Sequence, residues 1–114
     1  MFRTVVIGFD GSDQAHDALA LAQALGGSQA TLIAACVYSY EPTHTRSPVA
    51  NLKYERALRE SAERVLAGAE GASETRAIPC GSPARGIHEL AEEVGADLIV
   101  AGSTHHGMRP RKLS

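Results

Sequence analysis

Short apolar segments alternate with longer amphipathic segments along this chain, and that alternation limits the fold more than any other feature of the sequence. Four segments are predicted to be strands and three to be helices: strands at 3–9, 31–37, 74–78 and 97–101, and helices at 13–25, 50–67 and 83–94. Strands that alternate with helices form a parallel sheet whose crossovers are right-handed. The sequence therefore predicts an α/β fold with helices flanking a parallel sheet.

The position of two strands in the sheet follows from their polarity. Val5, Val6 and Ile7 are consecutive, apolar and β-branched, as expected for a strand that is covered on both faces. The 74–78 segment is short and polar, which is typical of a strand at the edge of a sheet. We therefore expect the first strand to be central and the third to lie at an edge.

Helix boundaries are marked by capping residues. Ser12 and Ser82 are predicted to be N-caps, while Gly26-Gly27 and Gly95 end the first and third helices. The prolines and hydroxyl residues of 38–49 predict a loop. In the second helix we expect an apolar stripe of Tyr54, Leu58, Ala62, Val65 and Leu66, and a solvated face of Glu55, Arg56, Arg59, Glu60, Glu63 and Arg64.

Length and charge exclude several classes of protein. The 114 residues fit one domain, 1–114, and no apolar run approaches the roughly 20 residues that span a bilayer. No secretory leader is evident in the sequence, and we expect a cytoplasmic protein without a membrane partner. A net charge of −2 argues against nucleic-acid binding. Cys36 and Cys80 are expected to be reduced and mostly buried.

Ligands of parallel sheets bind beyond the carboxyl ends of the strands, where the strand order reverses. Asp10-Gly11-Ser12 follows the first strand. The carboxylate of Asp10 can accept from a ribose hydroxyl, Gly11 allows close backbone approach, and the helix start at Ser12 offers N–H groups. A plain strand-to-helix turn, with Asp10 as an accessory cap, is the alternative interpretation.

The second candidate site follows the fourth strand, from its last residue Ala101 into the loop Gly102, Ser103, Thr104, His105, His106 and Gly107. Glycine followed by hydroxyl residues can wrap a phosphate, although a polar loop without a ligand is an equal alternative. Neither GxxxxGK[ST] nor GxGxxG occurs. We expect no metal site, because His105 and His106 are adjacent and no carboxylate cluster accompanies them. No G-x-S-x-G elbow supports a catalytic triad.

The chain resembles the universal stress protein family over its whole length. The resemblance rests on three stretches: Val-Val-Ile-Gly-Phe-Asp-Gly-Ser at 5–12, Gly-Ser-Pro-Ala-Arg-Gly-Ile at 81–87, and Leu-Ala-Glu-Glu-Val-Gly-Ala-Asp-Leu-Ile-Val-Ala-Gly-Ser at 90–103. The resemblance implies a Rossmann-like fold of the adenine nucleotide alpha hydrolase type, with strand order 3-2-1-4-5. It also implies ATP as the ligand, with Asp10 near the adenosine, Val37 presenting backbone to adenine, and Gly102 opening a phosphate loop.

Departures from the family pattern weaken the ATP expectation. The family's G-x2-G-x9-G-[ST] loop has its second glycine where this chain has His105, and Gly107 lies two residues beyond that position. The closing G-[ST] and the fifth strand are missing from the sequence, which therefore resembles a C-terminally truncated member. We expect ATP to bind weakly or not at all, and a homodimer or larger assembly to cover the open edge of the fourth strand.

Three classes of function remain open at the level of sequence. The first is a regulatory stress protein that binds adenine nucleotide without being an enzyme. The second is a stress protein of the same fold that binds no nucleotide and acts through protein contacts. The third is a related ATP-using enzyme, which is disfavoured because the S-G-G-x-D-S loop of that group is absent.

Overall fold

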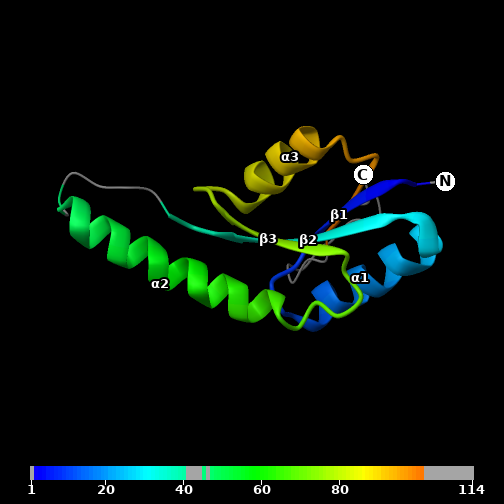
Figure 1. The fold of residues 1–114 in the computed structure, drawn as a ribbon, viewed down its shortest axis with the longest axis horizontal. Helices are drawn as coiled ribbons and strands as arrows, with labels where there is room; N and C mark the ends of the chain where they lie inside the picture. The colour runs from blue at the N-terminus through cyan, green and yellow to red at the C-terminus, as the bar shows by residue number, and fades with distance from the viewer. Residues whose placement is uncertain (1, 41–44, 46, 102–114) are drawn as a thin grey trace.

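The computed structural model describes residues 2–40, 45 and 47–101. Its elements are β1 (Thr4–Gly8), α1 (Asp13–Gly26), the 3₁₀ turn η1 (Gly27–Gln29), β2 (Thr31–Tyr38), α2 (Pro48–Leu66), β3 (Glu74–Pro79), α3 (Pro83–Val94) and β4 (Leu98–Ala101). The four strands form a parallel sheet in the order β3-β2-β1-β4 (Figure 1). The predicted α/β fold, the strand order 3-2-1-4 and the edge position of β3 are confirmed.

The helices cover both faces of the sheet, α1 and α2 on one face and α3 on the other (Figure 1). Side chains of a strand point alternately to opposite faces. Val5 and Ile7 therefore pack against α1, whereas Val6 packs against α3, and all three are fully buried. Because the connection through α3 runs back past β2 and β1 to reach β4, a right-handed crossover puts α3 on the opposite face from α1 and α2.

The capping residues at both ends of α1 and α3 lie largely where the sequence predicts. Ser12 and Ser82 accept hydrogen bonds from backbone N–H groups of α1 and α3, and Gly27 and Gly95 end these helices with positive φ. The predicted start of the second helix at 50 is wrong by two residues. Ser47 caps α2 and Pro48 is its first residue, because proline is tolerated where the helix has no N–H to bond.

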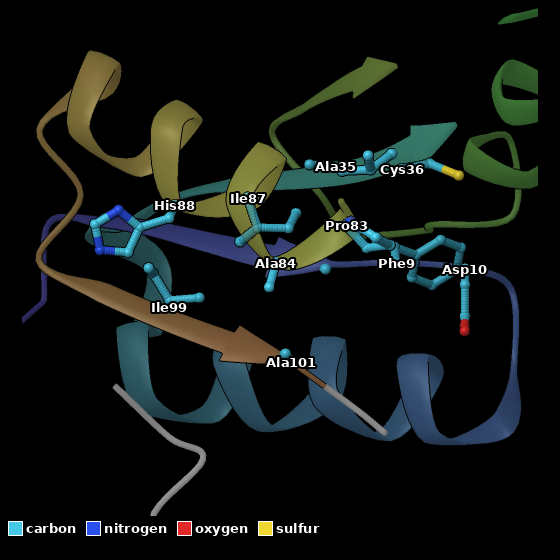
Figure 2. Close-up of a pocket in the computed structure, with 12 residues that line it drawn as sticks. Phe9, Asp10, Ala35, Cys36, Pro83, Ala84, Ile87, His88, Ile99 and Ala101 are labelled. Atoms are coloured by element: carbon cyan, nitrogen blue, oxygen red, sulfur yellow. The ribbon is translucent and has the colours of Figure 1, made fainter. Parts of the chain in front are cut away.

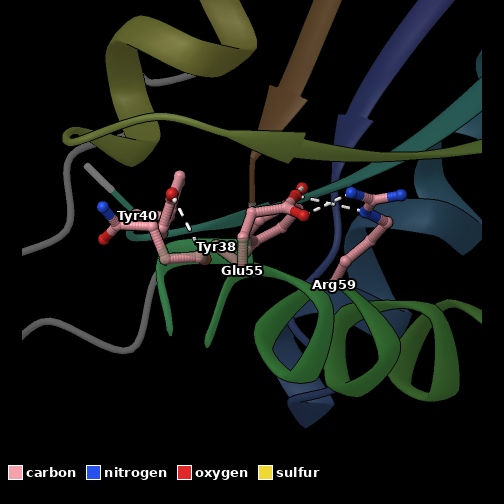
Figure 3. Close-up of polar contacts among 5 residues, drawn as sticks. Tyr38, Tyr40, Glu55 and Arg59 are labelled. Atoms are coloured by element: carbon pink, nitrogen blue, oxygen red, sulfur yellow. Dashed lines mark hydrogen bonds and ion pairs between the residues drawn. The ribbon is translucent and has the colours of Figure 1, made fainter. Parts of the chain in front are cut away.

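The N-terminal half of α2 extends past the sheet, and this overturns part of the predicted apolar stripe (Figure 1). Only Ala62 and Leu66 of α2 are buried, whereas Tyr54 is 45% exposed. A polar contact holds the middle of this helix to the sheet, as Figure 3 shows. The Tyr38 hydroxyl at the end of β2 donates to the Glu55 carboxylate, which also pairs with the Arg59 guanidinium.

The amino ends of β1 and β4 are joined by one side chain. The Asp97 carboxylate accepts the backbone N–H groups of Arg3 at 2.9 Å and Thr4 at 3.1 Å. These two hydrogen bonds, the Arg3 bond foremost, hold the pKa of Asp97 below its ordinary value of 3.8. Asp97 therefore favours alignment of the first and last strands while it is ionised.

Candidate functional site

A cavity of about 510 Å³ opens at the carboxyl ends of β1, β2 and β4, beneath the N-terminal half of α3 (Figure 2). Its size lies within the roughly 300–1,000 Å³ that is usual for small-molecule sites. Its lining is mostly apolar and consists of Gly8, Phe9, Asp10, Ala35, Cys36, Val37, Pro83, Ala84, Ile87, His88, Ile99 and Ala101. The cavity therefore lies where the strand order reverses between β1 and β4, the place that the topology predicts.

Asp10 lies at one end of the cavity, in the turn that joins β1 to α1 (Figure 2). Its Oδ1 accepts the backbone N–H of Ser12 at 2.9 Å, and Ser12 Oγ accepts the N–H of Ala15 at 3.1 Å. Gly11 between them has φ +84°, and a Cβ there would lie 3.2 Å from a methyl of Val65. The turn therefore requires glycine for its conformation as well as for close approach.

The protonation state of Asp10 is set by two opposed effects. Partial burial raises the pKa of this carboxyl, while hydrogen bonds from the Ser12 side chain and backbone lower it. The hydrogen bonds prevail, so the pKa of Asp10 lies below its ordinary value of 3.8 and the group is a carboxylate at neutral pH. A carboxylate has about four acceptor sites, so Asp10 keeps acceptor capacity for hydroxyl donors of a ligand.

Val37 offers its backbone N–H and C=O to the cavity. In β2, Ala35 accepts the N–H of Phe9 from the β1 side, and Tyr38 accepts the N–H of Cys80 from the opposite side. Backbone N–H and C=O groups of successive residues point to opposite sides of a strand, so those of Val37, two residues after Ala35, point toward β1. Since β1 pairs with β2 only as far as Gly8 and Phe9, no described residue of β1 bonds to Val37. A donor and an acceptor of Val37 therefore border the cavity.

Two glycines determine the shape of the cavity. Gly8 lies at its base, where a Cβ would meet side chains of Ala101 and Ile87 at 3.8 Å, an ordinary contact. Gly86 in α3 is more restrictive, because a Cβ there would lie 3.0 Å and 3.1 Å from the two γ-methyls of Val37 and 3.2 Å from Cys80 Cβ. Gly86 therefore allows α3 to lie close over the end of β2.

The two cysteines are both free, as expected, but their surroundings differ. Cys36 is half-buried and lines the cavity, where burial and then the negative charge of Asp10 raise the pKa of its thiol. Cys80 is buried in the short segment between β3 and α3. Hydrogen bonds from the Ser82 backbone and the Arg85 side chain, whose Nε lies 3.3 Å from Cys80 Sγ, lower the pKa of that thiol.

The structure brings together some of the predicted site residues. Asp10, Val37 and Ala101 line the cavity, and Gly11 and Ser12 form the adjoining turn. The predicted phosphate-loop residues Gly102, Ser103, His105 and Gly107 lie outside the described residues. The other residues that line the cavity were not predicted to do so; they are Gly8, Phe9, Ala35, Cys36, Ile99, Pro83, Ala84, Ile87 and His88. The last four belong to α3, and periodicity alone indicated only that Ile87 is buried.

The described residues hold no candidate for a metal site or a membrane-spanning helix. Within 2–40, 45 and 47–101, no three His, Cys, Asp or Glu side chains are grouped closely enough to hold a metal ion. Over the same ranges no helix has both the length and the apolar character needed to cross a bilayer.

The strand order 3-2-1-4, the helices on both faces and the cavity at the topological switch point define a Rossmann-like α/β domain. The family model described as "Universal stress protein family" matches residues 1–113. The universal stress protein Rv1636 of Mycobacterium tuberculosis is 31% identical over 115 residues, which cover 90% of this chain and 76% of that protein. This chain belongs to the universal stress protein family.

Other relatives and solved structures agree with this assignment. A universal stress protein of Thermus aquaticus is 34% identical over 108 residues, covering 90% of this chain and 78% of that protein. A crystal structure of a universal stress protein in complex with cAMP is 33% identical, with a TM-score of 0.55 over 87% of this chain and 75% of that chain. The crystal structure of Rv1636 gives a TM-score of 0.54 at 30% identity, over 94% and 75% of the two chains.

Proposed function

We propose that this chain is a regulatory adenine-nucleotide-binding protein of the stress response, and that its ligand binds in the cavity between α3 and the ends of β1, β2 and β4. The observation that carries the proposal is that the Asp10 carboxylate and the backbone groups of Val37 both line one mostly apolar cavity. The cAMP complex of a related universal stress protein supports an adenine nucleotide as the ligand class.

Each part of a nucleoside has a partner of suitable chemistry in this cavity. The N–H and C=O of Val37 suit the adenine edge, which carries both an acceptor and a donor. Apolar side chains such as Ala84 and Ile87 offer surface to the faces of the base. The Asp10 carboxylate is the acceptor for a ribose hydroxyl, and a hydrogen bond to a charged group contributes about 1.5–3 kcal/mol.

Binding rather than catalysis is the role that suits these residues. Asp10 is the one carboxylate among the described residues that line the cavity. A general base works best when its pKa lies near the working pH, whereas the pKa of Asp10 is lowered by its hydrogen bonds with Ser12 against the opposing effect of burial. We therefore propose that the bound nucleotide is a signal and that the chain is not an enzyme.

The proposal separates the nucleoside from the phosphates. The described cavity supplies contacts for the base and the ribose, and phosphate contacts are assigned by family resemblance to 102–107. At position 105 the sequence has histidine where the family pattern has glycine, and a residue with a side chain is expected to be less suited to close approach of backbone to phosphate. We expect the triphosphate of ATP to add little affinity, so that ATP binds weakly and no more tightly than cAMP.

Calorimetric titration of the full chain with adenosine, cAMP and ATP tests the proposal. Asp10→Ala removes the charged acceptor and is expected to weaken binding of each ligand about 10- to 100-fold. Asp13→Ala is the matched control, because Asp13 is an exposed acid in the first turn of α1 and does not line the cavity. If Asp10→Ala binds as tightly as Asp13→Ala, the assignment of the site is wrong.

A second variant tests the cavity without changing charge. Gly8→Ala adds one methyl at its base, in ordinary contact with Ile87 and Ala101 and at a position without positive φ. We expect the variant to unfold at the same urea concentration as the wild type but to bind nucleotide more weakly. Unchanged affinity for all three ligands would mean that the nucleotide lies elsewhere.

The alternative of a stress protein that binds no nucleotide makes an opposite prediction. No heat of binding would then be seen with adenosine, cAMP or ATP, even with the wild-type chain at high concentration. The long exposed part of α2 is the feature that favours a role in protein contacts, and it is a surface separate from the cavity.

A further inference from the structure

The face of α2 that points away from the sheet carries charges sorted by sign. This outer α2 face consists of Val49, Leu52, Lys53, Arg56, Glu60 and Glu63. Its residues are spaced three and four apart, so they lie along one side of the helix. The N-terminal half of the face is apolar and basic, and the C-terminal half is acidic.

The outer α2 face is accessible to a partner. All six of its residues are exposed, and the side chains of Val49 and Leu52 are 61% and 67% exposed. In Figure 1 the N-terminal half of α2 projects beyond the sheet, so the other described elements do not cover it. Within the described part of the chain, none of the four charged residues of the face forms an ion pair.

The order of these charges stabilises an isolated helix less than the opposite order would. A helix is stabilised by acidic residues near its N-terminus and basic residues near its C-terminus, and pairs in which Glu precedes Lys or Arg by four residues are the better ones. On the outer α2 face the order is the weaker one, because Arg56 precedes Glu60 by four residues and Glu63 lies in the last turn, where Arg64 is the basic residue. A second surface of opposite order would add attraction across the face.

A second copy of α2 in antiparallel orientation has that opposite order, and we propose that the outer α2 face is a self-complementary surface through which two copies of this chain associate. When the helices cross near residue 58, Lys53 of each copy faces Glu63 of the other, and Arg56 faces Glu60. The twofold axis repeats each contact, which gives four ion pairs across the interface. A parallel arrangement would oppose like charges.

Apolar contacts in the same register support the choice of partner. Val49 of one copy lies opposite Ala67 of the other, which is the exposed C-cap residue of α2. Leu52 lies opposite Arg64, whose aliphatic stem can cover it. With exposed ion pairs and few apolar contacts we expect a weak dimer, with a Kd on the order of 100 µM.

Sedimentation equilibrium of the full chain over a concentration series at low salt tests the proposal. The double variant Glu60→Lys/Glu63→Lys makes the face wholly basic, and Lys53→Glu/Arg56→Glu makes it wholly acidic. Each alone is expected to raise the Kd of self-association about 10- to 100-fold. An equimolar mixture of the two is expected to form a heterodimer at least as tight as the wild-type dimer.

A milder set tests a single predicted contact. Lys53→Glu and Glu63→Lys each oppose like charges and weaken self-association, and mixing the two variants restores it. Asp17→Lys/Glu92→Lys is the control, since it reverses two exposed acids on α1 and α3 and leaves the outer α2 face unchanged. We expect this control to dimerise as the wild type does.

The expected association also depends on salt, because exposed charges are screened over about 10 Å at 0.1 M salt and about 3 Å at 1 M. Three results would overturn the proposal. One is a wild-type chain that stays monomeric at about 1 mM, well above the Kd expected here for exposed ion pairs. Another is a mixture of the oppositely charged variants that stays monomeric. The third is a dimer that both double variants preserve, which would assign association to another surface such as the β4 edge.

Discussion

Gly86 lies in the first part of α3, directly over the end of β2, and an alanine there tests how α3 is seated on the sheet. The added Cβ would lie 3.0 Å and 3.1 Å from the γ-methyls of Val37 and 3.2 Å from Cys80 Cβ. Carbon atoms in good contact are about 3.5–4.0 Å apart, so each contact is short by several tenths of an ångström. Two of these atoms are the γ-methyls of a β-branched side chain, which is stiff at χ1, and the third is a Cβ fixed by the backbone, so none can move away easily.

Two opposed effects of Gly86→Ala decide whether the free energy of unfolding rises or falls. Overpacking of a filled site costs about 1–3 kcal/mol. Replacing glycine by alanine inside a helix returns about 0.5–1 kcal/mol. We therefore expect Gly86→Ala to lower the free energy of unfolding by about 1–2 kcal/mol, and to weaken nucleotide binding as well, since α3 forms one wall of the cavity.

Urea unfolding followed by circular dichroism measures this change, with two variants for comparison. Gly68→Ala is the matched control, because the nearest atom to its Cβ is the Val65 carbonyl oxygen at 3.5 Å, and we expect a change within about 0.5 kcal/mol. Val37→Ala removes the opposing methyls, so the cost of Gly86→Ala should fall in that background. A Gly86→Ala chain as stable as Gly68→Ala, or a cost that does not depend on Val37, would refute the reasoning.

Three further predictions concern the turn and the polar contacts of the sheet. Gly11→Ala is expected to destabilise the chain by at least about 1 kcal/mol in urea unfolding, since φ +84° strains a non-glycine residue and Val65 lies 3.2 Å from the new Cβ; a neutral change would contradict the turn geometry. Asp97→Asn is expected to lower the melting temperature at pH 7, because the ionised Asp97 is held by the N–H groups of Arg3 and Thr4. The pKa of Asp97 is lowered by folding, so its contribution is lost as the pH falls below about 4, and a difference from the wild type that is as large at pH 3 as at pH 7 would refute this. Tyr38→Phe is expected to lower the urea midpoint at neutral pH by removing the hydrogen bond to Glu55. Burial and then that hydrogen bond raise the pKa of Tyr38, so its contribution declines as the pH rises through 10; a gap that widens above pH 10 would count against it.

The central place of β1 and the edge place of β3 were predictable because the two strands differ in polarity, whereas the order 3-2-1-4 followed from the family resemblance. Val5, Val6 and Ile7 are apolar on both faces, which is typical of a strand within a parallel sheet that has helices on both sides. The stripe of α2 was less predictable. Tyr54 has the correct spacing to be buried, but periodicity does not reveal where the sheet beneath a helix ends.

The candidate site was predicted from its strands and not from its helix. Asp10 and Val37 follow from topology and family resemblance, because residues at the carboxyl ends of parallel strands meet at one edge. Ala84 and His88 line the cavity only because Gly86 lets α3 approach the sheet. No local pattern indicates how close a helix will lie to a strand that precedes it by more than forty residues.

The central position of β1 has a consequence for how the chain acquires its structure during synthesis. β1 leaves the ribosome before the other described strands, yet one of its two neighbours is β4, with Val5 beside Leu98. At about 5–20 residues per second, the segment from β1 to β4 takes roughly 5 to 20 seconds to be made. During that interval one edge of a strand that is fully buried in the finished fold has no native neighbour, so nascent chains are expected to need a chaperone or a fast translation rate to avoid aggregation.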